Sequence, residues 1–352
     1  MGVDRDQPTA DKQVARVFEW RRGFNTMYLI DLGLCLGLFR ALADEPGSSA
    51  QELADRLGLQ LHHVEVWCKT AYAQEILDAD ENGGFRLAPF FDSILANPNH
   101  PRYLGGYVRL ATEVAAEDFR RCRDAFRTGQ AVPFQGRGEA FAQVTAQATQ
   151  GLQVLTARKI LLGLSDLKQR LDAGGTILEV GCGTGNLLLE LAKTFPKARC
   201  LGIDIDEASL AIARGKIDKA GLGGRIDVVQ GAPDAALAPA SADACVMIEV
   251  LHEIAAALRP ALLKAAATAL RPGGWMVIID ETYPSTLEEM RRPEFRFPLQ
   301  TAFEELIWGN VIPTREEQET LLKDAGFTCP INRELVGEGF TVLTTRSAAQ
   351  SL

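Results

Sequence analysis

The stretch ILEVGCGTGN at residues 177–186 decides the fold of this chain. An apolar run containing Glu179 leads into three glycines at alternate positions: Gly181, Gly183 and Gly185. The segment NLLLELAKTF that follows has the apolar spacing of a helix. A glycine-rich turn between a strand and a helix lets a ligand approach the backbone closely, and the helix N-terminus offers free N–H groups. The stretch therefore predicts a ligand-binding loop directly after a buried strand.

The spacing of the glycines narrows the class of ligand. Dinucleotide-binding folds use G-x-G-x-x-G, whereas G-C-G-T-G is one residue shorter, so the spacing disfavours an NAD-dependent oxidoreductase. Asp204 ends the next predicted strand, 19 residues after Gly185, where its carboxylate could accept hydrogen bonds from two ribose hydroxyls. We therefore expect a ligand that contains a nucleoside but is not held by a pyrophosphate-type turn.

The 352-residue chain divides by its pattern into two predicted domains, 1–170 and 171–352. In the first, apolar residues recur three and four apart, as they do in helices. From Thr176 onward, short β-branched strands alternate with helices, which is typical of a parallel α/β sheet. Strands are predicted at 176–181, 199–204, 225–230, 242–250 and 275–280, with a closing hairpin near the end.

Composition excludes several classes of protein. The net charge of −9 argues against a default polyanion partner. Seven scattered cysteines without a C-x-x-C pair suit reduced thiols better than disulfides or a zinc site. The polar N-terminus lacks the apolar core of a secretory signal. We therefore expect a cytoplasmic protein that acts on a small molecule, with no metal, nucleic-acid or membrane partner.

The segment from about residue 170 onward resembles a known family. E-V-G-C-G-T-G-N followed by L-G-I-D is similar to motifs I and II of the class I S-adenosylmethionine-dependent methyltransferases, and R-P-G-G and A-G-F follow at the expected intervals. The resemblance implies a Rossmann-like, seven-stranded sheet, S-adenosylmethionine as cofactor and S-adenosylhomocysteine as product. It also implies a set of cofactor-binding residues: Glu179, Gly181, Gly183, Gly185, Asp204, Ala232 and Glu249.

Adenine binding departs from the family pattern. Many members carry an acid directly after the glycine that ends the third strand, and that acid binds the adenine amino group. Ala232 occupies this position in the run Q-G-A-P-D. Either the backbone of Ala232 or the side chain of Asp234, two positions on, is expected to hold adenine.

The first half adds a narrower resemblance. Residues 36–90 read as three helices and a short hairpin with N-G at its turn, which is a winged-helix pattern. A winged helix before this catalytic domain is similar to the small-molecule O-methyltransferases. That resemblance implies a homodimer formed through the N-terminal domain, which also helps to close the substrate pocket.

A winged helix also allows a second interpretation, a transcriptional regulator that binds S-adenosylmethionine. Residues 1–170 carry 20 Lys and Arg against 21 Asp and Glu, which is a net charge of −1. The presumed recognition helix has one Lys and two Glu, so it lacks the basic surface that phosphate binding needs. The enzyme is the favoured interpretation.

His252 and Glu281 are the candidate catalytic residues. His252 follows the fourth strand, at the place where the resemblance implies a general base, and an imidazole suits the removal of a phenol proton near neutral pH. Glu281, in the pair Asp280–Glu281 at the end of the fifth strand, is expected to orient it. A packing or substrate-contact role for His252 stays open, as does a nitrogen or carbon acceptor methylated by proximity alone.

Overall fold

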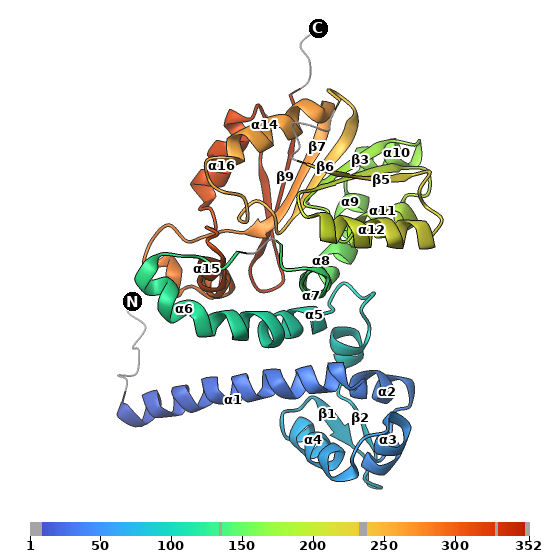
Figure 1. Cartoon of the computed structure of the whole chain (residues 1–352), viewed down its shortest axis with the longest axis vertical. Helices are drawn as coiled ribbons and strands as arrows, with labels where there is room; N and C mark the ends of the chain where they lie inside the picture. Colours follow the sequence, from blue (N-terminus) through green and yellow to red (C-terminus); the bar gives the residue numbers. More distant parts are fainter. Residues whose placement is uncertain (1–8, 134–135, 232–237, 328–329, 349–352) are drawn as a thin grey trace, which may run out of the picture. The chain divides into compact units, whose positions relative to one another are not determined.

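The computed structural model describes residues 9–133, 136–231, 238–327 and 330–348. The chain forms two compact units, residues 1–112 and 113–352, coloured along the sequence in Figure 1. The predicted division at residue 170 lies later in the chain. Helices α6–α10, which have the same helical pattern as the first half, belong to the second unit, where α6 packs with α15 and α10 packs with β6.

The first unit is mainly helical. Its elements are α1 (Ala10–Cys35), α2 (Leu38–Asp44), α3 (Ala50–Leu57), α4 (Leu61–Ala73), β1 (Leu77–Ala79), β2 (Phe85–Leu87), η1 (Asp92–Ala96) and α5 (Gly105–Arg109). A reciprocal capping box between Ser49 and Glu52 starts α3, and β1 pairs with β2 as an antiparallel hairpin. Leu38, Leu42 and Trp67 pack into the core of this unit.

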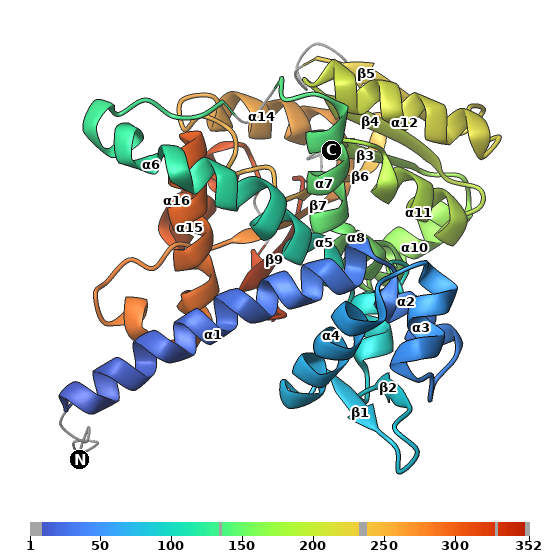
Figure 2. The ribbon, with the colours of Figure 1, turned by 60° about the horizontal axis from the view of Figure 1, so that its bottom comes forward.

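Helix α1 is long (Figure 2), and several of its apolar side chains are exposed. Five of its apolar residues are 54–62% exposed: Val14, Val17, Phe18, Trp20 and Phe24. Among the described residues no single helix has the length and hydropathy needed to cross a membrane. The pair α1 and α2 meets those criteria only when taken together, across a 64° bend.

The second unit begins with helical segments. These are η2 (Leu110–Ala115, which starts in the first unit), α6 (Ala116–Thr128), α7 (Glu139–Ala148), α8 (Gln150–Leu155), η3 (Thr156–Ile160), α9 (Leu161–Gly163) and α10 (Ser165–Asp172). After α10 the chain enters the sheet.

Seven strands form one mixed sheet. They are β3 (Thr176–Val180), β4 (Arg199–Asp204), β5 (Ile226–Gln230), β6 (Ala242–Ile248), β7 (Leu270–Glu281), β8 (Asn332–Val336) and β9 (Phe340–Arg346). Their order is β5-β4-β3-β6-β7-β9-β8, with β9 antiparallel to both of its neighbours and the other pairs parallel. Successive strands from β3 to β5 are added toward one edge of the sheet, whereas β6 and β7 are added on the other side of β3, so the strand order reverses between β3 and β6. Ligands of open α/β sheets bind at the carboxyl ends of the strands beside such a reversal.

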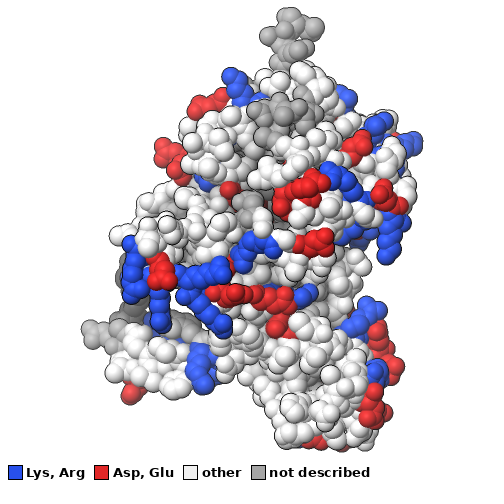
Figure 3. All heavy atoms as spheres, in the orientation of Figure 1, with Lys and Arg blue, Asp and Glu red and all other residues white. Residues whose placement is uncertain are grey.

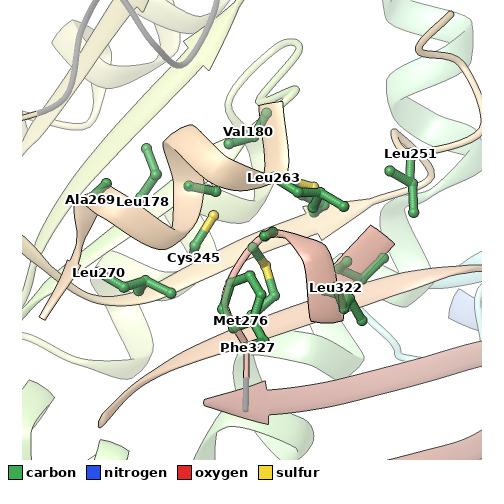
Figure 4. Close-up of a cluster of buried hydrophobic side chains, with 14 of the residues drawn as sticks. Leu178, Val180, Cys245, Leu251, Leu263, Ala269, Leu270, Met276, Leu322 and Phe327 are labelled. Atoms are coloured by element: carbon green, nitrogen blue, oxygen red, sulfur yellow. The ribbon is translucent and has the colours of Figure 1, made fainter. Parts of the chain in front are cut away.

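In the described part of the second unit, five further α-helices accompany this sheet: α11 (Asn186–Thr194), α12 (Glu207–Lys219), α14 (Arg259–Ala269), α15 (Arg296–Trp308) and α16 (Arg315–Asp324). Side chains of β3, β6 and β7 pack with α14 and α16 in the cluster of Figure 4, where Cys245 and Met276 are fully buried. Each large aliphatic side chain buried there contributes roughly 1.5–3 kcal/mol to folding. This core fixes the strand ends that carry the candidate site.

Candidate active site at the carboxyl edge of the sheet

The glycine loop after β3 uses its glycines in two different ways. Gly181 has φ +72°, and a Cβ at this position would lie 2.3 Å from the side chain of Val250. Gly183 also has positive φ, +48°, but a Cβ there would meet no atom within 4 Å. Gly181 is therefore required by the packing of the protein itself. At Gly183 the space is not filled by protein, which suits the close approach of a ligand.

Asp204 stands at the end of β4 beside this loop. Its Oδ2 accepts a hydrogen bond from the Gly183 amide at 2.7 Å, and its Oδ1 accepts one from the Asp206 amide at 2.9 Å. Burial raises the pKa of Asp204, although these two amides lower it. A carboxylate offers about four lone-pair positions, so Asp204 keeps acceptor capacity for a ligand hydroxyl. The loop and the predicted ribose-binding acid thus form one unit.

Two buried carboxylate oxygens on the neighbouring strands have no hydrogen-bond partner among the described residues: Oε2 of Glu179 and Oε1 of Glu249. Burial and the charge of Asp204 raise the pKa of Glu179 well above its usual value. Glu249 directly follows β6 and has φ +56°, a strained conformation for a residue with a side chain. Unpaired buried acceptors are costly unless a donor arrives, so both suit a cationic or N–H-bearing ligand.

His252 is held on one side by Asp280, the next-to-last residue of β7. The ring Nδ1 lies 2.6 Å from Asp280 Oδ1, and the backbone amide of His252 donates to Asp280 Oδ2 at 3.2 Å. Asp280 Oδ1 also accepts from the Glu281 amide at 2.8 Å. Both side chains are buried, and these three contacts fix the ring by its Nδ1 edge.

The predicted orienting residue, Glu281, lies farther from the ring. Its Oε2 is 3.6 Å from His252 Nδ1, whereas Asp280 makes the short contact. Neither carboxylate oxygen of Glu281 has a hydrogen-bond partner in the described part of the chain. Both carboxylates therefore approach the Nδ1 edge of the ring, but Asp280 is the one within hydrogen-bond distance.

Glu305 of α15 approaches the other side of the ring. Its Oε1 is 3.6 Å from His252 Nε2, and its Oε2 accepts a hydrogen bond from Asn310 Nδ2 at 2.7 Å. No motif pointed to Glu305, because it lies far from His252 in sequence. Helix α15 is anchored by Trp308, whose indole donates to the buried Asp118 of α6 at 2.9 Å.

Carboxylates set the electrostatics around the ring. Burial lowers the pKa of His252, but Asp280, Glu305 and Glu281 raise it more, to well above its usual value. Burial raises the pKa of Glu281 to about 7 and that of Glu253 to about 8. Arg259 does not pair with these acids through its hydrogen bonds, since its guanidinium donates to the backbone oxygens of residues 252, 254 and 311. The histidine therefore lies buried among carboxylates.

The structure brings most of the predicted residues to one edge of the sheet. Glu179, the three loop glycines and Asp204 follow or end β3 and β4, while Glu249, His252 and Glu281 follow or end β6 and β7. These two groups flank the reversal in the sheet. Ala232, predicted to lie near adenine, is outside the described residues, as is Asp234. Asp280 and Glu305 are the additional members of the site.

Comparison with known proteins agrees with this geometry. Residues 177–274 match a family described as a methyltransferase domain. A 3-hydroxy-5-methyl-1-naphthoate 3-O-methyltransferase of Streptomyces sahachiroi is 29% identical over 69% of this chain and 70% of its own. The tetracenomycin polyketide synthesis 8-O-methyl transferase of Streptomyces glaucescens is 28% identical over 70% and 72%.

Solved structures are similar over nearly the whole chain. A human N-acetylserotonin methyltransferase in complex with SAM has a TM-score of 0.76 at 20% identity, covering 99% of this chain and 100% of that one. The mitomycin 7-O-methyltransferase structure has a TM-score of 0.67 at 19% identity, covering 97% and 100%. The predicted fold, a mainly helical region before a seven-stranded methyltransferase sheet, is confirmed, as is the prediction of a methyltransferase.

Proposed function

We propose that this methyltransferase transfers a methyl group from S-adenosylmethionine to a hydroxyl of a small aromatic or polyketide-like molecule. The observation that carries the proposal is the pairing of His252 Nδ1 with Asp280 at 2.6 Å, beside the strand ends that bear the cofactor-binding residues. A general base is useful for a hydroxyl acceptor, which must lose its proton as the new bond forms.

The residues present fit S-adenosylmethionine as the cofactor. Gly183 leaves its space free, and Asp204 keeps acceptor capacity for the two ribose hydroxyls. The unpaired oxygens of Glu179 and Glu249 suit the ammonium group of the methionine end. When bound, S-adenosylmethionine supplies a methyl group activated by a sulfonium. What the protein adds is binding, orientation and the handling of one proton.

Asp280 fixes the tautomer that the base needs. Because Nδ1 is hydrogen-bonded to the Asp280 carboxylate, we assign the proton of the neutral ring to Nδ1 and the lone pair to Nε2. Nε2 accepts the proton of the substrate hydroxyl, and Asp280 stabilises the imidazolium that forms. The buried setting excludes water that would compete for the same proton.

The nature of the acceptor is supported by the relatives. The two Streptomyces proteins are named as O-methyltransferases, one of a naphthoate and one in polyketide synthesis. The experiment is to incubate the purified protein with S-adenosylmethionine labelled at its methyl group and a panel of phenols, aromatic amines and activated carbon acceptors. The proposal expects label in aryl methyl ethers. Label found only in N-methyl or C-methyl products would contradict it.

Charge distribution supports an enzyme over a DNA-binding regulator. On the face drawn in Figure 3, acidic and basic side chains are interspersed over the surface. Residues 61–73 of α4 contain one Lys, one Glu and two His, so the presumed recognition helix offers little positive charge to phosphates. Weak, salt-sensitive binding to random duplex DNA would agree with this proposal, and tight sequence-specific binding would contradict it.

We further propose that residues 1–112 form a winged-helix dimerisation unit. The exposed apolar residues of α1 support this, because five large side chains in water along one helix are costly unless a partner covers them. A second copy is the proposed partner, in the cytoplasm, where the described cysteines stay reduced. Light scattering tests it: the wild type should be a dimer at micromolar concentration, and the double variant Trp20→Glu/Phe24→Glu should be a monomer.

A further inference from the structure

His252 has a carboxylate at each ring nitrogen. Asp280 lies 2.6 Å from Nδ1 and Glu305 lies 3.6 Å from Nε2, and the three side chains come from separate segments of the chain. A neutral imidazole has one N–H donor and one lone pair, so it can satisfy only one of two carboxylates. The doubly protonated ring has a donor at each nitrogen, so it is the ring form that matches two ionised carboxylates.

Glu305 is held in place by its surroundings. Its side chain is 8% exposed, and Asn310 holds its outer oxygen with a 2.7 Å hydrogen bond. The Asn310 amide also donates to the Glu305 carbonyl at 3.0 Å. The stacked rings of Phe119 and Phe303 and the indole bond from Trp308 to Asp118 tie the same helix to α6. The contact with Nε2 therefore belongs to a fixed helix and not to a freely rotating surface side chain.

We propose that Glu305 is a positioning residue that holds the Nε2 edge of His252 in the protonated form and gives up this contact when a substrate hydroxyl reaches Nε2. This inference rests on the proposed function, in which His252 is the base. It adds a consequence that a packing role would not have. Glu305 should make the resting enzyme a poorer base at neutral pH and make turnover rise with pH.

Other charged groups face the same ring and must be counted. They are Glu249 and Glu253 after β6, Asp280 and Glu281 of β7, Glu305 of α15 and Arg259 of α14. Of these, Asp280 and Glu305 are the two that lie at opposite nitrogens in the described structure. Removing the charge of Glu305 leaves the Nδ1 contact intact, so its effect can be separated from that of Asp280.

The test is an NMR titration of the histidine rings in the wild type and in Glu305→Gln. The chain has only four histidines, so the His252 signal can be assigned by its loss in His252→Asn. An opposite charge at this distance shifts a pKa by about 1–3 units, so the midpoint for His252 should fall by about one pH unit or more in Glu305→Gln. The pH at which kcat reaches half its maximum should fall with it.

Further variants serve as controls for this titration. Glu305→Asp keeps the charge and should titrate close to the wild type, while Asn310→Ala, which releases Glu305, should shift the midpoint in the same direction as Glu305→Gln but less far. Glu316→Gln changes an exposed acid on α16 and should leave the midpoint in place. Thermal melts of each variant show whether it folds. If Glu305→Gln does not fold, Asn310→Ala decides the question.

The outcomes separate this inference from the proposed function. An unchanged His252 midpoint in folded Glu305→Gln would overturn the role of Glu305 even if His252 is essential for turnover. Nearly full turnover in His252→Asn would overturn the base itself, whatever the titration shows. A lower midpoint together with a lower pH optimum supports both.

Discussion

The two sides of the candidate site are built by different means. On one side, the glycine loop and Asp204 come from two adjacent strands, and backbone amides hold the carboxylate. On the other side, His252, Asp280 and Glu305 come from three separate segments and meet through side chains. A contiguous motif encodes the first side, whereas the packing of α15 and the ends of β6 and β7 assembles the second.

This difference explains what the sequence could predict. The loop was recognisable because its glycines, the strand before it and the helix after it are neighbours in the chain. The predicted fold class is confirmed, since alternating strands and helices leave few possible topologies. By contrast, Glu305 could not be found from spacing, because its position beside His252 depends on how helix α15 packs in three dimensions.

The pair Asp280–Glu281 shows that the sequence could predict an acid beside His252 but not which of two adjacent acids contacts the ring. Both are acids at the end of one strand, and both approach Nδ1 of the ring, so only the three-dimensional geometry shows which one makes the hydrogen bond. Glu281 was expected to orient His252, but Asp280 makes the short contact in the structure. The predicted domain boundary at residue 170 differs from the division after Thr112 for a similar reason. A helical pattern alone does not show which unit a helix packs against.

The largest expected effect lies on the histidine side. Replacing His252 with Ala should lower kcat by about 10²–10⁴-fold, the usual contribution of general-base catalysis. The KM for S-adenosylmethionine should change little, because the ring does not belong to the glycine loop. Steady-state kinetics with saturating acceptor measure both. Retention of nearly full kcat at pH 7 would reduce His252 to a packing or substrate-contact residue.

A smaller loss is expected on the cofactor side. Asp204→Ala removes the acceptor for the ribose hydroxyls and also releases the Gly183 amide. Loss of hydrogen bonds to a charged group costs roughly 1.5–3 kcal/mol, which is about a 10–100-fold rise in Kd for S-adenosylmethionine. Calorimetry measures this change. Asp206→Asn is the matched control on the same turn, and unchanged binding in Asp204→Ala would contradict the assignment.

Two glycine substitutions compare structural and ligand-binding roles inside one loop. Gly181→Ala places a Cβ 2.3 Å from Val250 and should lower the free energy of unfolding by about 2–4 kcal/mol, from strain and overpacking together. Gly183→Ala meets no protein atom, so it should cost only about 1–2 kcal/mol of stability but weaken cofactor binding. Denaturant melts and binding titrations separate the two. Equal losses of stability would contradict the distinction.

The smallest effect on turnover is expected for Glu281, whose effect on stability depends on pH. Burial raises its pKa to about 7, above the usual value of 4.5. A group whose pKa is raised in the folded state stabilises the fold below its unfolded pKa, and this contribution is lost as the pH rises towards 7. Glu281→Gln should therefore gain stability relative to the wild type as the pH rises from 4.5 to 7, by up to about 3 kcal/mol. Its kcat should fall far less than that of Asp280→Asn, and equal losses would restore Glu281 as the orienting residue.

The separation of cofactor binding by the glycine loop and Asp204 from proton transfer by His252 is tested most directly by calorimetry. S-adenosylmethionine is titrated into His252→Ala and into Asp204→Ala under the same conditions. We expect His252→Ala to bind with the Kd of the wild type and Asp204→Ala to bind about 10–100-fold more weakly. Equal weakening in both variants, or wild-type binding in both, would contradict the account of a cofactor side built on the glycine loop and a chemical side built on the histidine.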